Sequence, residues 1–152
     1  MIDALTAHRE IKSTFWNAWK AMDFASLGLA AVPLVQWWDL DDGTLPDPQA
    51  PFARFSLKVL TDPQVTFRGP FQQKRRFSAT GIVTVQVFTP TSSRNGSTLN
   101  QKLAIIAQAA YRVGSSPSGV WFRDVVAKPI GSDGAGWFQT NVSATFNYDT
   151  EQ

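Results

Sequence analysis

The chain contains no cysteine and only one histidine, His8, among its 152 residues. Without cysteine, disulfide bonds, thiol catalysis and cysteine-ligated metal sites are excluded. A single histidine also removes most zinc sites and most Ser-His-Asp arrangements. No apolar run reaches the roughly 18 residues of a membrane span, and the charged residues among the first ten positions are unlike a secretory signal. We therefore expect neither a membrane segment nor a cleaved leader in this sequence.

Acidic residues are missing from the middle of the chain. Residues 63–123 contain eight bases and no acid, whereas residues 1–62 contain eight acids and five bases, and residues 124–152 contain four acids and one base. The bases of the middle segment are Arg68, Lys74, Arg75, Arg76, Arg94, Lys102, Arg112 and Arg123. This segment could contact nucleic acid, pair with the acidic segments of its own monomer, or meet the acidic surface of a neighbouring subunit. The charge pattern alone leaves all three interpretations open.

Groups that could carry catalysis or bind a metal are sparse. Asp39, Asp41 and Asp42 lack the further ligands and the closing glutamate of a calcium loop, so a solvated turn is the better interpretation. The serines of residues 115–119 have no base to activate them. The glycines of residues 131–136 precede a strand pattern, whereas a phosphate-binding loop opens a helix. We predict that the protein is not an enzyme and has no catalytic residue, cofactor or metal ion.

Hydrophobic periodicity predicts the secondary structure. Apolar residues from Ile2 to Met22 recur at steps of three and four, which is typical of an amphipathic helix. Alternation from Phe77 to Val87 is typical of a half-buried strand, and the turn that ends at Thr98 offers hydroxyl N-caps for a second helix. The expected helices are 2–22 and 98–112, and the expected strands are 34–40, 52–60, 77–90, 120–130 and 137–148.

This order of elements predicts an α+β fold. We expect one domain over residues 1–152: a mixed, mainly antiparallel sheet of four to five strands, with two helices packed on one face and an extended β-arm or loop at about residues 64–76. The arm combines basic residues with aromatic ones such as Phe71. It could stack on single-stranded nucleic acid, dock on another protein, or fold its aromatic rings onto its own core.

Two tryptophans, Trp16 and Trp38, are candidates for a protein interface. Trp16 lies off the apolar stripe of the first helix. Adjacent residues of a strand, such as Trp37 and Trp38, are expected to point to opposite faces. One of that pair then leaves the face that the helices cover, and exposed aromatic residues often mark interfaces. His8 lies on the buried stripe, so we expect a packed histidine.

Several segments, together spanning nearly the whole chain, follow one layout. They are Ala7–Lys12 in the first helix, Pro33–Trp38 in the first strand, the strand 52–59, the arm ending in Gln72–Arg76, and Gly81–Pro90 followed by a loop, the helix 99–112 and two closing strands. This layout resembles the tail-terminator family of long-tailed bacteriophages, also described as minor tail protein U-like or tail-completion proteins. The resemblance is one of pattern, and it brings no catalytic residues.

The resemblance implies a virion structural protein that is assembled in the host cytoplasm and located at the junction of head and tail. Members of the family form hexameric rings on the end of the tail tube, stop its polymerisation and provide a docking surface for head–tail joining. The implied partners are other copies of the chain, the tail tube protein and a head-closure or connector protein. Genomic DNA passes through the lumen without specific binding, and no membrane is involved.

The candidate interface residues, toward the tube or a neighbouring subunit, are Arg68, Phe71, Lys74, Arg75, Arg76, Trp16 and Trp38. The candidates for facing the lumen and its DNA are Arg94, Lys102 and Arg112. Two alternatives stay open: a nucleic-acid-binding module that uses the basic arm, and another head–tail connector or head-closure protein.

Overall fold

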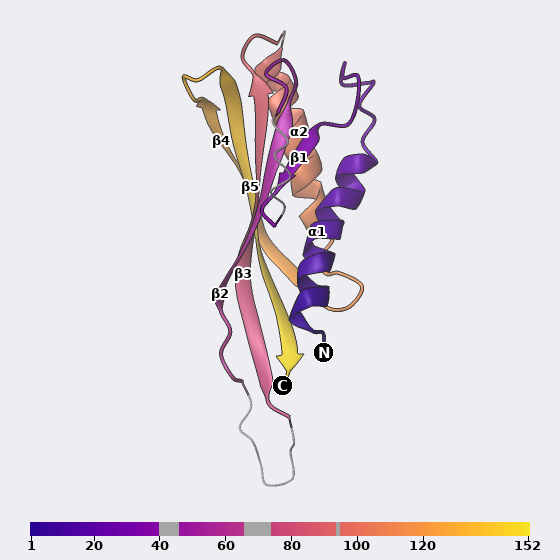
Figure 1. The fold of residues 1–152 in the computed structure, drawn as a ribbon, viewed down its shortest axis with the longest axis vertical. Helices are drawn as coiled ribbons and strands as arrows, with labels where there is room; N and C mark the ends of the chain where they lie inside the picture. Colours follow the sequence, from indigo (N-terminus) through magenta and orange to yellow (C-terminus); the bar gives the residue numbers. More distant parts are fainter. Residues whose placement is uncertain (40–45, 66–73, 94) are drawn as a thin grey trace.

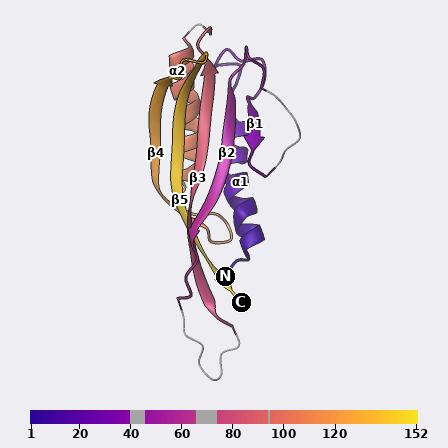
Figure 2. The ribbon, with the colours of Figure 1, turned by 60° about the vertical axis from the view of Figure 1, so that its left-hand side comes forward.

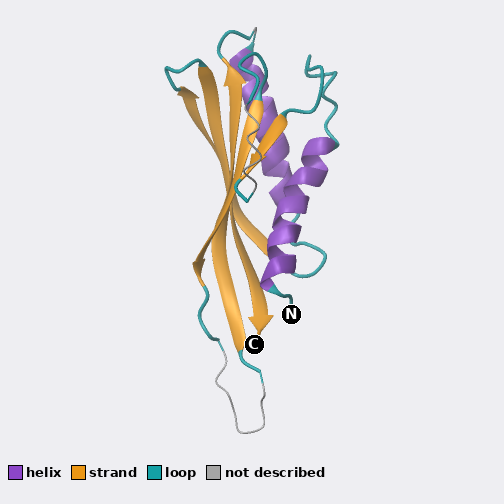
Figure 3. Cartoon of the chain, viewed as in Figure 1, coloured by secondary structure: helices purple, strands orange, loops and turns teal. Residues whose placement is uncertain are grey.

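The computed structural model describes residues 1–39, 46–65, 74–93 and 95–152. These residues form a twisted sheet with a layer of helices on one face (Figures 1 and 3). The helices are α1 (Ala4–Lys20) and α2 (Gly96–Tyr111), and the strands are β1 (Leu34–Trp37), β2 (Phe52–Thr61), β3 (Arg76–Pro90), β4 (Trp121–Ser132) and β5 (Trp137–Glu151). The predicted elements are therefore all present, with shifted ends.

The described strands form one sheet in the order β1-β2-β3-β5-β4. β1 runs parallel to β2, and the other neighbouring pairs are antiparallel. β3 and β5 pair along their whole length, from Arg76 opposite Glu151 to Pro90 opposite Trp137, and form the spine of the sheet. Because the connection through α2 passes over β5, β4 takes the outer position. This mixed, mainly antiparallel sheet with helices on one face confirms the predicted α+β fold.

The apolar stripe of α1 packs onto the sheet. Ala7, Ile11, Phe15 and Trp19 are fully buried, and the ring of Phe15 lies 5.6 Å from that of Phe55 on β2. Burying side chains of this size contributes roughly 1.5–3 kcal/mol for each large apolar residue. The helix begins where predicted to within two residues because the Asp3 carboxylate accepts a hydrogen bond from the Thr6 amide at 2.9 Å. The buried Tyr111 hydroxyl of α2 donates to the carbonyl of Ile11 at 2.9 Å, which joins the two helices.

α2 begins at Gly96, earlier than the predicted Thr98, and its cap differs from the prediction. The N-cap residue is Asn95 in the left-handed conformation, with φ 56°, and no side-chain hydrogen bond caps the helix. The predicted hydroxyl cap is therefore wrong. A Cβ atom at Gly96 would lie 2.7 Å from the Pro90 carbonyl oxygen and 3.3 Å from the ring of Phe138. The helix can follow β3 this closely because position 96 has no side chain.

Glu10 ties α1 to the loop between α2 and β4. Its carboxylate accepts hydrogen bonds from the Ser116 and Ser118 hydroxyls and from the Ser118 amide, the last at 3.2 Å. The Ser116 hydroxyl oxygen in turn accepts from the Val120 amide at 3.0 Å. Partial burial acts to raise the pKa of Glu10, but the hydrogen bonds outweigh it and hold that pKa below its usual range.

We expect Glu10→Gln to lower the free energy of unfolding at neutral pH and to have a smaller effect at about pH 3. A carboxylate whose pKa is depressed by folding stabilises the protein above its unfolded pKa of about 4.3, and this stabilisation is lost as the pH falls through the folded pKa. Urea unfolding of both proteins at the two pH values measures the difference. An equal gap at both values would contradict the role of the ionised carboxylate.

β2, β3 and the end of β5 run past the helix layer (Figures 1 and 2). Beyond the regular β2–β3 pairing, Gln64 bridges Phe77, and the Val65 amide donates to the Arg76 carbonyl at 2.9 Å. On the other side of β3, Gln152 and Arg75 exchange backbone hydrogen bonds. We call these three paired segments, residues 59–65, 74–79 and 148–152, the arm base. The predicted strand 137–148 is thus too short, because β5 continues to Glu151 beside the arm.

Candidate functional site

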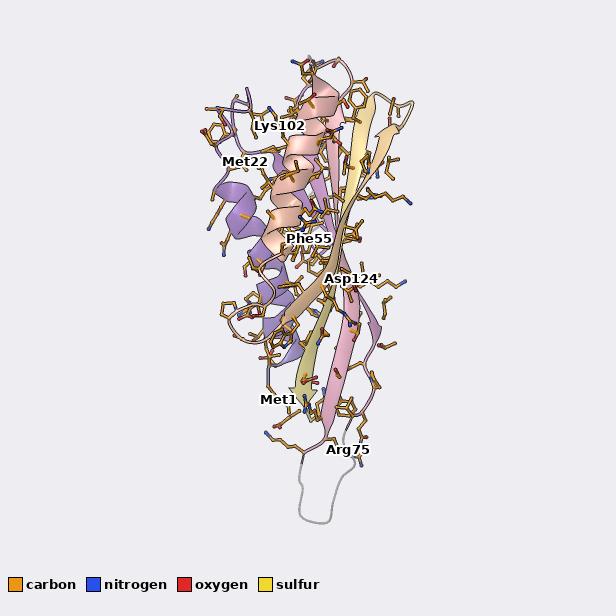
Figure 4. All side chains as sticks on the ribbon, turned by 180° about the vertical axis from the view of Figure 1, so that it is seen from behind. Met1, Met22, Phe55, Arg75, Lys102 and Asp124 are labelled. Carbon is orange, nitrogen blue, oxygen red and sulfur yellow. The ribbon has the colours of Figure 1, made fainter. Side chains whose placement is uncertain are left out.

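The arm base presents basic and apolar side chains side by side. Lys74 and Arg75 are exposed there. Figure 4 shows Arg75 at the end of the molecule where the strands extend past the helices. The exposed apolar residues of the β2 side are Val59, Leu60 and Val65, with exposed fractions of 37%, 51% and 49%. Apolar side chains exposed beside cations are typical of a surface that docks on another protein. Arg68 and Phe71, predicted to act with them, lie outside the described residues.

Arg76 differs from its two neighbours because its guanidinium binds within the monomer. Its Nε donates to an Asp149 carboxylate oxygen at 3.1 Å, and Nη2 contacts the same oxygen. These hydrogen bonds hold the pKa of Asp149 below its usual range. Three interpretations of the basic middle segment were left open. For Arg76 the structure supports the second, in which the segment pairs with an acidic segment of its own monomer.

A second candidate surface lies where α1 meets β1. Trp16 and Trp38, predicted as interface residues, are 37% and 41% exposed, and the ring of Trp16 lies 5.8 Å from that of Trp37. The Lys12 ammonium stands 4.6 Å from the centre of the Trp37 ring and 3.3 Å from an Asp39 carboxylate oxygen. The ion pair with Asp39 holds the Lys12 ammonium over the tryptophan rings, an arrangement that favours cation–π attraction.

Trp37 and Trp38 do not point to opposite faces of the sheet, contrary to the prediction. Their rings lie 5.2 and 5.4 Å from that of Phe55, which is on the face that the helices cover. β1 ends at Trp37, so the strict alternation of a strand no longer applies to Trp38. The backbone of Trp38 nevertheless donates to the Phe55 carbonyl at 3.0 Å.

His8 borders a groove of about 370 Å³ beside these tryptophans. The lining residues are Leu5, His8, Arg9, Lys12, Trp38 and Asp39. The Nε2 atom of His8 lies 3.0 Å from the Tyr148 hydroxyl, and burial lowers the pKa of the imidazole. His8 therefore packs against Tyr148 as predicted, but it is half-buried and does not join the buried residues of α1.

The face of the sheet away from the helices, called here the open face, is rich in neutral polar residues. Between the pair Ser78–Asp149 and the pair Pro90–Trp137 at the other end of the two strands, β3 and β5 place no charged side chain on this face. Its polar residues on the two strands are Thr80, Thr84, Gln86, Gln139, Asn141, Ser143, Thr145 and Asn147. Ile82, 37% exposed, lies among them.

Cations flank this neutral stripe on both sides. On β2, Arg54 lies opposite Gln86 and Lys58 opposite Ile82. On β4, Lys128 lies opposite Asn141 and Arg123 opposite Thr145. Two rows therefore cross the open face: Arg54–Gln86–Asn141–Lys128 and Lys58–Ile82–Thr145–Arg123. All four cations are exposed.

Lys102 and Arg112, predicted to face a lumen with its DNA, lie in the helix layer. Both are exposed, Lys102 in the first half of α2 and Arg112 directly after its last residue, and Figure 4 shows Lys102 on the helix side of the sheet. They are separated from the open-face cations by the sheet itself, so one monomer cannot present both sets to one ligand. Arg94, the third residue of this prediction, lies outside the described residues.

The remaining predicted sites add no further cluster. Asp39 pairs with Lys12, whereas Asp41 and Asp42 lie outside the described residues. Along the described ranges, no group of three or more His, Asp or Glu side chains is placed to hold a metal ion. No helix in these ranges has the length and apolar character needed to cross a membrane.

Sequence reasoning missed the open-face cations as a group. The alternation of Arg54, Ser56 and Lys58 is typical of a strand and places these residues on one face of β2. It could not show that Arg123 and Lys128 lie across from them. That relation depends on the strand order, in which β5 separates β3 from β4.

Comparison with known proteins identifies the fold but no family. No protein-family model matches the chain, and no curated protein matches it. Several solved structures match the chain. One of them, of a protein whose name states no activity, has 15% sequence identity and a TM-score of 0.57, over 92% of this chain and 94% of the other. At this identity the likeness shows a shared fold alone.

Proposed function

We propose that the protein is a bacteriophage tail terminator, which forms a ring on the end of the tail tube, stops polymerisation of the tube and provides the docking surface for head–tail joining. The proposal begins from the resemblance of sequence layout. The observation that carries it furthest is the arm base, where exposed cations and exposed apolar side chains stand on strands that project past the helix layer.

A projecting arm suits ring formation for a geometric reason. A closed ring of identical subunits uses heterologous contacts, in which one surface of a subunit meets a different surface of the next. The arm base lies at one end of the molecule, whereas the aromatic surface around Trp16 and Trp38 lies beside α1 and β1. These two surfaces differ in chemistry and position, so the first can bind a neighbour or the tube without competing with the second.

The first test is self-association and capping. We expect sedimentation at high protein concentration to show a species of hexamer size, or electron microscopy to show rings on the ends of tail tubes made from the tube protein of the same genome. A protein that stays monomeric at every concentration and never caps tubes would overturn the proposal. So would virions with normal tail length after deletion of the gene.

Variants of the arm base connect this activity to the proposed surface. We expect the combined change Leu60→Ser, Val65→Ser, Lys74→Glu and Arg75→Glu to weaken ring formation or capping at least about tenfold, which corresponds to about 1.4 kcal/mol. Exposed positions rarely alter folding by more than about 0.5 kcal/mol each, so thermal unfolding should stay close to that of the parent. The matched control, Lys102→Glu with Arg112→Glu at α2, lies away from both surfaces and should cap normally. Equal loss in both variants would point to net charge and not to the arm base.

A further inference from the structure

The four cations of the open face stand at the corners of a rectangle. Three strand spacings of about 4.8 Å separate β2 from β4, so the two sides lie about 14 Å apart. Along β2, Arg54 and Lys58 are four residues apart, which gives a separation of about 13 Å at about 3.3 Å per residue. On β4, Arg123 and Lys128 are five residues apart, but the bulge after Arg123 makes them span the same length of β5, from Thr145 to Asn141. The major groove of B-DNA is about 12 Å wide. Cations on the two sides can therefore reach phosphates on both borders of one groove.

The chemistry between the corners also suits a phosphate backbone. Protein contacts to DNA phosphates come from Arg and Lys and also from Ser, Thr, Asn and Gln side chains. The central strands of the open face consist mainly of the four neutral types, and Gln139 already donates to Asn141 at 2.8 Å along this face. The acid nearest the corners is Asp124, in the bulge of β4, whose carboxylate oxygen lies 3.9 Å from Arg123 Nε with both side chains largely exposed. Such an exposed pair is weak and leaves the cation accessible.

Arg54 is the most firmly positioned of the four. Its Nε donates to the Gln36 side chain at 2.9 Å. Its guanidinium lies 5.6 Å from the centre of the Phe52 ring and 5.2 Å from that of Phe88. These two rings stack 4.8 Å apart and are almost fully buried. The group is therefore held in place before any ligand arrives, which lowers the entropic cost of contact.

We infer that the open face binds the backbone of double-stranded DNA, independently of sequence, through Arg54, Lys58, Arg123 and Lys128. The inference deepens the proposed function, since it assigns the surface that faces DNA in a ring that DNA traverses. It assigns this surface to the sheet and not to the cations of α2.

The test is the salt dependence of binding to a duplex of about 30 base pairs, measured by fluorescence anisotropy with the full chain. Neutralising four phosphates gives a slope of log K against log salt of about −3.6, or a roughly 150-fold loss of affinity between about 50 and 200 mM salt. We expect Arg54→Gln, Lys58→Gln, Arg123→Gln and Lys128→Gln together to bring the slope close to zero. A triple variant that keeps Arg54 guards against misfolding, because the Arg54 contacts stay intact. It should leave a slope of about −0.9.

The matched control removes the same charge from the helix layer, with Arg9→Gln, Lys20→Gln, Lys102→Gln and Arg112→Gln. It should keep the slope of the parent protein. No DNA binding by the parent at low salt, or a slope lost equally in both quadruple variants, would overturn the inference. It would also be overturned if the open-face variant changed self-association and left DNA binding intact, because the face would then dock on a second copy.

Failure of this inference and failure of the proposed function are distinguishable. A chain that caps tubes normally but whose DNA binding does not depend on the open face overturns the inference alone. A chain that binds DNA through this face but never forms rings or caps tubes overturns the proposed function alone.

Discussion

Gly81→Ala is expected to lower the free energy of unfolding by about 3 kcal/mol, the upper end of the usual cost of overpacking. Gly81 lies on the core face of β3, opposite Val59 on β2 and Phe146 on β5. An added Cβ would collide with the Lys58 backbone carbonyl and with the ring of Phe146. One obstacle is backbone and the other is a fully buried ring, so neither can move aside cheaply. Urea unfolding of the purified proteins measures the loss.

Two companion variants separate the collision from other causes. Thr84→Ala changes the same strand on its open face and should stay within about 0.5 kcal/mol of the parent protein. Phe146→Leu removes the ring, so combining it with Gly81→Ala should cost less than the sum of the two single changes. The rescue should be partial, because the Lys58 carbonyl remains. A Gly81→Ala protein as stable as the Thr84→Ala protein would contradict this account of the glycine.

The alternation of β3, which includes Gly81, could be predicted from the sequence, because it depends only on residues that are close together in the chain. Val83, Val85 and Val87 are buried as the period-2 pattern predicts, and β5 shows the same alternation. The helix stripe containing Ile11 follows from local spacing in the same way. Elements defined by their own periodicity were therefore predicted, together with the α+β class that their order implies.

Features that depend on which strands pair with each other could not be predicted from the sequence. The parallel pairing of β1 with β2 and the position of β5 between β3 and β4 arise from packing between distant segments. Ends of elements also depend on neighbours: β5 continues because residues of the arm base pair with it, and Trp38 leaves the alternation because β1 stops. Asp124 has a positive φ of 51° in the bulge of β4, an irregularity inside the expected strand 120–130.

The candidate functional residues were likewise predictable only in part. Lys74 and Arg75 were predicted as interface residues of the arm, and the structure shows them exposed, as such a role requires. Pairing of Arg76 with Asp149 required the register of β3 on β5, in which Ser78 lies opposite Asp149. The rectangle of open-face cations required the order of four strands. Sequence thus indicated which side chains carry charge, and the fold determined which of them act on one surface.

The second large effect is expected at Asn100, a buried polar residue that joins α2 to the sheet. The two N–H groups of its side-chain amide share three acceptors: the carbonyl of Val87 at 3.0 Å, the hydroxyl of Thr89 at 3.1 Å and the carbonyl of Phe138 at 3.2 Å from the nitrogen. Its oxygen accepts from the Thr140 hydroxyl at 2.5 Å. Every polar atom of the side chain is therefore bonded in a site that is 3% exposed, which makes loss of the donor expensive.

Asn100→Asp replaces this donor by an oxygen at nearly constant size. At neutral pH we expect a loss of about 3–5 kcal/mol, because a buried carboxylate would face two carbonyl oxygens without a compensating charge. Burial raises the folded pKa of such a group above its unfolded value of about 3.9. The penalty is therefore smallest below about pH 4 and grows as the pH rises toward the folded pKa. Urea unfolding at about pH 3.5 and pH 7 measures this difference.

Two variants complete the experiment. Gln101→Asp places the same charge on the neighbouring exposed position in the second turn of α2, where water solvates it, so it should be nearly neutral. Asn100→Ala removes the amide without adding a charge and should cost about 2–3 kcal/mol at both pH values, since the oxygens it bonded lose a partner. If Asn100→Asp instead followed Asn100→Ala at both pH values, the buried charge would not be the cause. The donor role of the amide would then account for the whole loss.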